Sequence, residues 1–237
     1  MRRLFWMVAG AAVLWWAAVG AVNAATYTFD DLYTEWPGYE TDLNGEDTYG
    51  NPDILSLTVV TDDSGYLETI TVNFDADYGF GLSNEGDYNS LFINSQWQST
   101  EQYDNWDYYF DISNSGSLFP AVSGYDLTWQ SWSYTYAEED GQRIGHPNGI
   151  DTDSILVDND LWETIMWGIN SDGSELLLSL SFTEEAIRLG DEFVVGYNEY
   201  CANDNFLVTA QVPLPTTILL LGSGLVCMAG VRKRRHV

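Results

Sequence analysis

Two neighbouring runs of the chain alternate apolar and polar residues with the period of a β-strand. The runs cover residues 54–60 and 67–74, and both are rich in Ile, Leu, Val and Thr. The sequence Asp62-Asp63-Ser64-Gly65 lies between them and favours a tight turn. This pattern predicts a β-hairpin.

Further short runs of the same kind predict the other strands, and the polar segment 170–174 predicts a second hairpin turn. A segment at 183–189, capped by Ser181 or Thr183 and ending at Gly190, predicts one or two helical turns. Many short predicted strands and at most one short helix favour an all-β fold. We expect an antiparallel β-sandwich that is jelly-roll-like. The remaining predicted strands are residues 26–29, 90–94, 106–112, 155–157, 164–169, 176–182, 192–197 and 206–212.

Two aromatic stretches in the middle of the chain are out of phase with each other. Apolar and polar residues alternate in 125–129 and again in 132–136, but Gln130 and Ser131 come between them. A single strand keeps both aromatic sets on one face only if a β-bulge adds an extra residue. We therefore predict one strand with a bulge at Gln130-Ser131, and we assign most of these aromatic residues to the core.

The first residues have the three parts of a secretory signal peptide. Arg2-Arg3 precede an apolar run at 4–22, and Ala24 provides a small residue at the cleavage position. We predict a signal peptide over residues 1–24 that directs general secretion, with cleavage after Ala24. An uncleaved N-terminal anchor is the alternative.

The last residues, 212–237, consist of a short motif, an apolar stretch and a basic cluster. Val212-Pro213-Leu214-Pro215 is followed by the uncharged stretch 216–231 and then by Arg232-Lys233-Arg234-Arg235. An apolar stretch with a basic flank predicts a transmembrane helix whose basic end stays in the cytoplasm. Because the stretch is shorter than the ~20 residues that span a bilayer, we expect a weak anchor.

The order of these three parts resembles the PEP-CTERM sorting signal of exported proteins of Gram-negative bacteria. Leu214 replaces the Glu that gives the signal its name, and the Val-Pro-Leu-Pro form resembles a variant of the signal. The resemblance implies recognition of this motif by a membrane peptidase of the exosortase type, with retention in the inner membrane before processing. It also implies a cell-surface or extracellular destination, where exopolysaccharide is the expected partner. A plain single-pass anchor is the alternative.

Between the two ends, residues 25–211 form one predicted domain with a strongly acidic composition. All 36 acidic residues of the chain lie there, against only Arg143 and Arg188. Such a charge argues against nucleic acid and anionic membrane surfaces as partners. Trp, Tyr and Phe make up 15% of the chain, a content that argues against disorder. Cys201 is the only cysteine of the domain, so an intradomain disulfide is excluded.

Aspartate pairs in one region of the domain raise the hypothesis of a calcium site. Asp151, Asp153, Asp158 and Asp160 offer the hard oxygen ligands that Ca²⁺ prefers. Their spacing does not match the Asp-rich loop of an EF-hand, and aspartates of this kind are common in solvated turns. Both interpretations stay open at this point.

The domain offers few residue patterns that are typical of catalysis. His146 is its only histidine, and the motifs Gly-x-Ser-x-Gly, His-Glu-x-x-His and Cys-x-x-Cys are absent from the sequence. Among 36 carboxyl groups, spacing alone cannot identify the pair that a glycosidase uses. We therefore expect an exported protein with a structural or binding role, and not an enzyme. A carbohydrate-binding module or a carbohydrate-active enzyme on a β-sandwich is the alternative.

Overall fold

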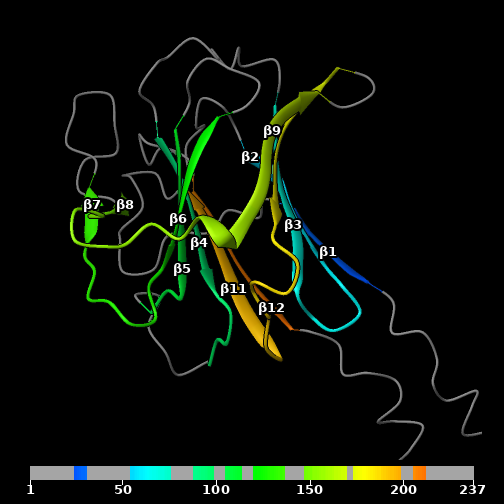
Figure 1. Cartoon of the computed structure of the whole chain (residues 1–237). Helices are drawn as coiled ribbons and strands as arrows, with labels where there is room; N and C mark the ends of the chain where they lie inside the picture. The colour runs from blue at the N-terminus through cyan, green and yellow to red at the C-terminus, as the bar shows by residue number, and fades with distance from the viewer. Residues whose placement is uncertain are drawn as a thin grey trace, which may run out of the picture. The chain divides into compact units, whose positions relative to one another are not determined.

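Two five-stranded antiparallel sheets make up most of the part of the chain that the structure describes (Figure 1). Sheet 1 contains, in spatial order, β1 (Ala25–Asp30), β2 (Ile54–Thr61), β3 (Leu67–Asp75), β10 (Glu175–Phe182) and β9 (Trp162–Ile169). Sheet 2 contains β12 (Asn205–Gln211), β11 (Glu192–Asn198), β4 (Tyr88–Asn94), β5 (Tyr108–Ser113) and β6 (Ala121–Asp126). The computed structural model describes residues 24–30, 54–75, 88–98, 105–113, 120–136, 147–169, 173–198 and 205–211.

The order of the strands shows how the chain builds the two sheets. Consecutive strands stay in one sheet in four runs, which are β1 to β3, β4 to β6, β9 to β10 and β11 to β12. In sheet 2 the chain then returns, so that β11 lies beside β4, and the order β11-β4-β5-β6 is that of a Greek key. The antiparallel two-sheet fold is confirmed. Its connectivity differs from the predicted jelly roll, in which most consecutive strands alternate between the sheets, because here most consecutive strands are hydrogen-bonded neighbours within one sheet.

The β2–β3 hairpin is confirmed, and local hydrogen bonds explain its turn. The Asp62 carboxylate accepts hydrogen bonds from the backbone N–H groups of Ser64 and Tyr66, at 2.7 and 2.8 Å. Gly65 has a φ of +85°, a conformation that glycine adopts without strain. The β9–β10 hairpin is confirmed as well, with Leu178 opposite Trp167.

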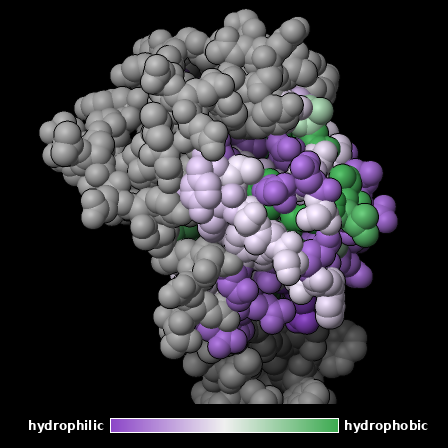
Figure 2. Space-filling model, turned by 90° about the vertical axis from the view of Figure 1, so that its left-hand side faces the viewer, coloured by the Kyte–Doolittle hydropathy of each residue, from purple (hydrophilic) through white to green (hydrophobic). Residues whose placement is uncertain are grey.

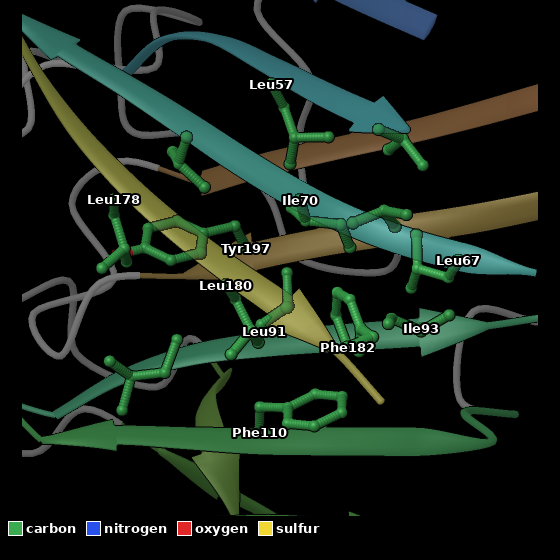
Figure 3. Packing of buried hydrophobic residues seen from close by; sticks show 14 of the residues in the cluster. Leu57, Leu67, Ile70, Leu91, Ile93, Phe110, Leu178, Leu180, Phe182 and Tyr197 are labelled. Atoms are coloured by element: carbon green, nitrogen blue, oxygen red, sulfur yellow. The ribbon is translucent and has the colours of Figure 1, made fainter. Parts of the chain in front are cut away.

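The main core lies between the two sheets, where the alternation of each strand directs its apolar side chains (Figure 3). Leu57, Ile70 and Leu178 of sheet 1 meet Ile93 and Phe110 of sheet 2, and all five are at most 2% exposed. Burial of an apolar side chain of this size stabilises a fold by about 1.5–3 kcal/mol. The contact between the sheets therefore supplies much of the driving force for folding.

A second, aromatic-rich core covers the outer face of sheet 2. Phe92, Tyr109 and Tyr125 point to this face from β4, β5 and β6, and the small sheet of β7 (Tyr134–Tyr136) and β8 (Pro147–Ile150) packs over them. Sheet 2 is therefore buried on both faces. The members of this second core are Phe92, Trp97, Trp106, Tyr109, Tyr125, Leu127, Ile150, Ile155, Val194 and Leu207.

The predicted single strand over 125–136, with its bulge at Gln130-Ser131, is wrong. β6 ends at Asp126, whose carboxylate accepts hydrogen bonds from the backbone N–H and the hydroxyl of Thr128, at 2.9 and 2.6 Å. Gln130 N–H then donates to the carbonyl of Leu127, which closes a turn. Both aromatic stretches still reach the second core, but from two separate strands.

Two other predicted elements also differ from the structure. Residues 155–157 form no strand, only an isolated bridge from Val157 to Tyr125, and the 3-10 turn η2 (Asn159–Leu161) follows. Residues 183–189 form one turn, in which Ala186 N–H donates to the Thr183 carbonyl, and then continue as extended chain. The extended form buries both Ile187 and Leu189, two positions apart, which a helix would direct to different sides.

Several predictions concern residues outside the described ranges. These are the signal peptide up to Asn23, the tail at 212–237, His146 and Cys201. Within the described ranges, no helix has the length and apolar character needed to cross a membrane. The boundaries of the domain stay a prediction.

Candidate functional site

Two loops, residues 127–133 after β6 and residues 151–158 after β8, lie side by side; we call them the paired loops. Leu156 N–H donates to the Gln130 side-chain oxygen at 3.2 Å, and Asp151 N–H donates to the Ser133 carbonyl at 2.9 Å. At its end, the second loop is held to β6, because Asp158 N–H donates to the carbonyl of Gly124 at 2.7 Å. Segments about 25 residues apart in sequence thus form one surface.

The four aspartates of the calcium hypothesis lie on or directly after the second loop, but they form two separate local turns. The Asp151 carboxylate accepts a hydrogen bond from Asp153 N–H at 3.1 Å, and the Asp158 carboxylate accepts one from Asp160 N–H at 3.0 Å. Among the described residues, no three His, Cys, Asp or Glu side chains are placed to hold a metal ion. The calcium site stays a prediction, and the geometry gives Asp151 and Asp158 a role as turn residues.

The paired loops expose large apolar side chains. Trp129 is 88% exposed, Leu156 78% and Val157 50%. Figure 2 views the molecule from the side on which β7 lies in Figure 1, and green hydrophobic side chains stand there among purple hydrophilic ones. All three residues belong to loops that a hydrogen bond joins, so the two loops together present exposed apolar groups, as binding surfaces do.

A row of aromatic rings continues from the first loop along β7. The ring centroids of Trp132 and Tyr134 are 5.1 Å apart, those of Tyr134 and Tyr136 are 6.4 Å apart, and both pairs are edge to face. Trp106 Nε1–H donates to the Tyr134 hydroxyl at 2.7 Å and fixes the row on the second core. The core assignment of these residues holds only in part, since Tyr136 is 42% exposed.

A row of five polar residues crosses the outer face of sheet 2, one from each strand. Its members are opposite one another in the strand register and are, in order, Asn205, Asn198, Ser90, Asp111 and Ser123. The sequence contained no local signal for this row, because it arises only when the register of five strands is known.

Hydrogen bonds join this polar row to β8, which lies above it. Ser90 donates from its hydroxyl to the carbonyl of Asn148 at 2.7 Å, and the Asn198 amide donates to the carbonyl of Pro147 at 2.9 Å. Within the described part of the chain, Oδ1 of Asn198 and Oδ1 of Asp111 are buried without a hydrogen-bond partner. Burial raises the pKa of the Asp111 carboxyl to about 6.

The residues assigned to sorting and membrane orientation lie outside the described ranges, and comparison with known proteins concerns this part of the chain. Residues 211–235 match the family model of the PEP-CTERM protein-sorting motif. The match contains the Val212–Pro215 motif and the Arg232–Arg235 cluster, so the predicted sorting signal is confirmed. No curated protein and no solved structure matches the chain. The motif indicates an exported protein that is sorted at the membrane by exosortase.

Proposed function

We propose that the chain is a cell-surface or extracellular-matrix protein that crosses the inner membrane and is released from it by a peptidase of the exosortase type. The observation that carries this proposal is the sorting-motif match over residues 211–235. In this proposal the apolar stretch 216–231 holds the chain in the membrane until processing, and the following basic cluster keeps its end in the cytoplasm.

We further propose that the β-sandwich has a structural or binding role with exopolysaccharide and is not an enzyme. The excess of 36 acidic residues over two arginines in residues 25–211 supports a solvated exported domain. The paired loops, with their exposed apolar side chains, provide a surface for such a role.

Intact-mass measurement of the protein collected from the cell surface tests the processing proposal. We expect the mature chain to begin near Ala25 and to end between Pro213 and Thr216, because the peptidase acts at the motif. In cells without the peptidase, the mass should include the whole tail. Detection of Arg232 to Arg235 in the surface form would leave the plain membrane anchor as the explanation.

A further inference from the structure

Trp129 is the most exposed of the large apolar residues in the described part of the chain. Its indole ring stands at the tip of a turn, with Leu156 and Val157 on the adjoining loop. We call Trp129, Gln130, Leu156 and Val157 the Trp129 surface. An indole that remains in water forgoes the stabilisation that its burial would give, so its exposure calls for an explanation other than folding.

The Trp129 surface is held in place by hydrogen bonds that involve both ends of the Gln130 amide. Its nitrogen donates to the carbonyl of Asp126 at 3.0 Å, and its oxygen accepts from Leu156 N–H at 3.2 Å. The Asp126 carboxylate fixes the preceding turn through Thr128. A surface that is ordered before binding loses less conformational entropy when a ligand arrives.

The charge around this surface limits the kind of ligand that it accepts. Asp126, Asp151, Asp153 and Asp158 lie on or beside the paired loops, and the domain contains few basic residues to offset them. Anionic polymers and anionic lipid surfaces are therefore repelled, and so is a second copy of the chain. Three exposed apolar side chains are also far fewer than the ~20–30 residues a side that form a stable protein interface.

These properties fit a small, uncharged ring with many hydroxyl groups. The flat face of an indole packs against the C–H face of a pyranose, and the adjoining loop exposes two further apolar side chains, Leu156 and Val157. Asp126 and Asp151 each use Oδ1 in a turn, and a carboxylate has further lone pairs that accept hydrogen bonds from hydroxyl groups. We infer that the Trp129 surface binds a neutral saccharide. This inference deepens the proposed function, because it names the ligand class and the residues of the binding role.

Native gel electrophoresis of the full chain through gels that contain a polysaccharide tests this inference. The chain is purified in a polyoxyethylene detergent, which has no sugar head group that competes for the site. The gels contain dextran, hydroxyethyl cellulose, galactomannan or the anionic polymer alginate. We expect at least one neutral polymer to retard the wild-type chain, with no retardation by alginate.

Three variants identify the surface that is responsible. Trp129→Ala should weaken binding at least about tenfold, which is the usual effect of removing a central aromatic contact. Trp129→Phe should retain part of the affinity, because it keeps a flat ring. Ile169→Ala removes a side chain that is 67% exposed on β9 of the other sheet, and it should leave binding unchanged.

Several outcomes would overturn the inference. One is that none of the three neutral polymers retards the wild-type chain. Another is that a neutral polymer retards the wild type and the Trp129→Ala variant equally. The third is that the wild type binds alginate more strongly than it binds the neutral polymers. Circular dichroism and thermal unfolding of each variant show whether the fold is kept, as expected for a side chain that is 88% exposed. Cleavage of the tail is measured separately, by the mass of the surface form. A failure of the sorting proposal would therefore not change what the gel experiment says about saccharide binding.

Discussion

At the scale of single residues, Asp111 combines burial with a charge that no described residue neutralises. Its side chain lies between Ser90 and Ser123 in the polar row, and Oδ1 has no hydrogen-bond partner there. Burial disfavours the charged carboxylate and raises the pKa from 3.8 to about 6. The folded chain therefore keeps a proton at this site over a pH range in which the unfolded chain has lost it.

This difference predicts how stability changes with pH. Between pH 4 and pH 6 the folded state binds more protons at Asp111, so the free energy of unfolding falls as the pH rises through this range. Asp111→Asn removes this contribution and should stabilise the protein at pH 7 by at most about 3 kcal/mol, while most of the gain disappears near pH 4.

Urea unfolding of the wild type and the variant at several pH values measures the effect. Asp63→Asn, in an exposed turn, serves as the control, because it changes the net charge equally without removing a buried carboxyl. A constant difference between the wild type and Asp111→Asn at all pH values would contradict the prediction.

At the scale of elements, the sequence predicted those parts of the fold that depend on local chemistry. The hairpin around Asp62 and Gly65 could be predicted because its turn is stabilised by residues of the turn itself. β8 was not among the predicted strands, because its Pro-Asn-Gly-Ile sequence has no strand pattern and its position depends on partners distant in sequence. The polar row and the paired loops could not be predicted either, because they also depend on partners distant in sequence. No local sequence pattern shows which residues face each other across strands or which loops are in contact.

The fit of β8 against sheet 2 leads to a second prediction. A Cβ atom at Gly149 would lie 2.9 Å from the Tyr109 hydroxyl and 3.0 Å from the Thr135 hydroxyl, so β8 approaches the sheet as closely as only glycine permits. Gly149→Ala should destabilise the protein by about 1–3 kcal/mol through overpacking.

Gly168→Ala is the matched control on β9, where Leu177 Cβ, at 4.0 Å, is the only neighbour within 4 Å among the described residues. Chemical denaturation of both variants gives the comparison. Equal stability of Gly149→Ala and Gly168→Ala would show that β8 is not tightly packed against sheet 2.

At the scale of the whole molecule, the acidic composition governs the response to ions. Folding brings 36 carboxyl groups together with few basic residues, so self-repulsion opposes the compact state and salt relieves it. Screening acts through any ion of the same charge, whereas the predicted calcium site at Asp151, Asp153, Asp158 and Asp160 would add a response that is specific to calcium.

Thermal unfolding with calcium or magnesium at a fixed, high ionic strength distinguishes these two responses. Screening alone predicts equal midpoints for the two ions. A ligand that binds only the folded state adds stability as RT ln(1 + [L]/Kd) and saturates, so a saturating rise with calcium alone would instead establish a calcium site.

The position of β12 has a mechanical consequence for a chain that is tethered at its C-terminus. β12 is an edge strand, and its last residue, Gln211, is paired with Glu192 of β11. The Val-Pro-Leu-Pro segment begins at the next residue. A pull on the tether is therefore transmitted first to the hydrogen bonds between β12 and β11. If the tail is cut within Pro213 to Thr216, as we propose, that load disappears and β12 keeps its full length. Release from the membrane then leaves every backbone hydrogen bond between β12 and β11 in place.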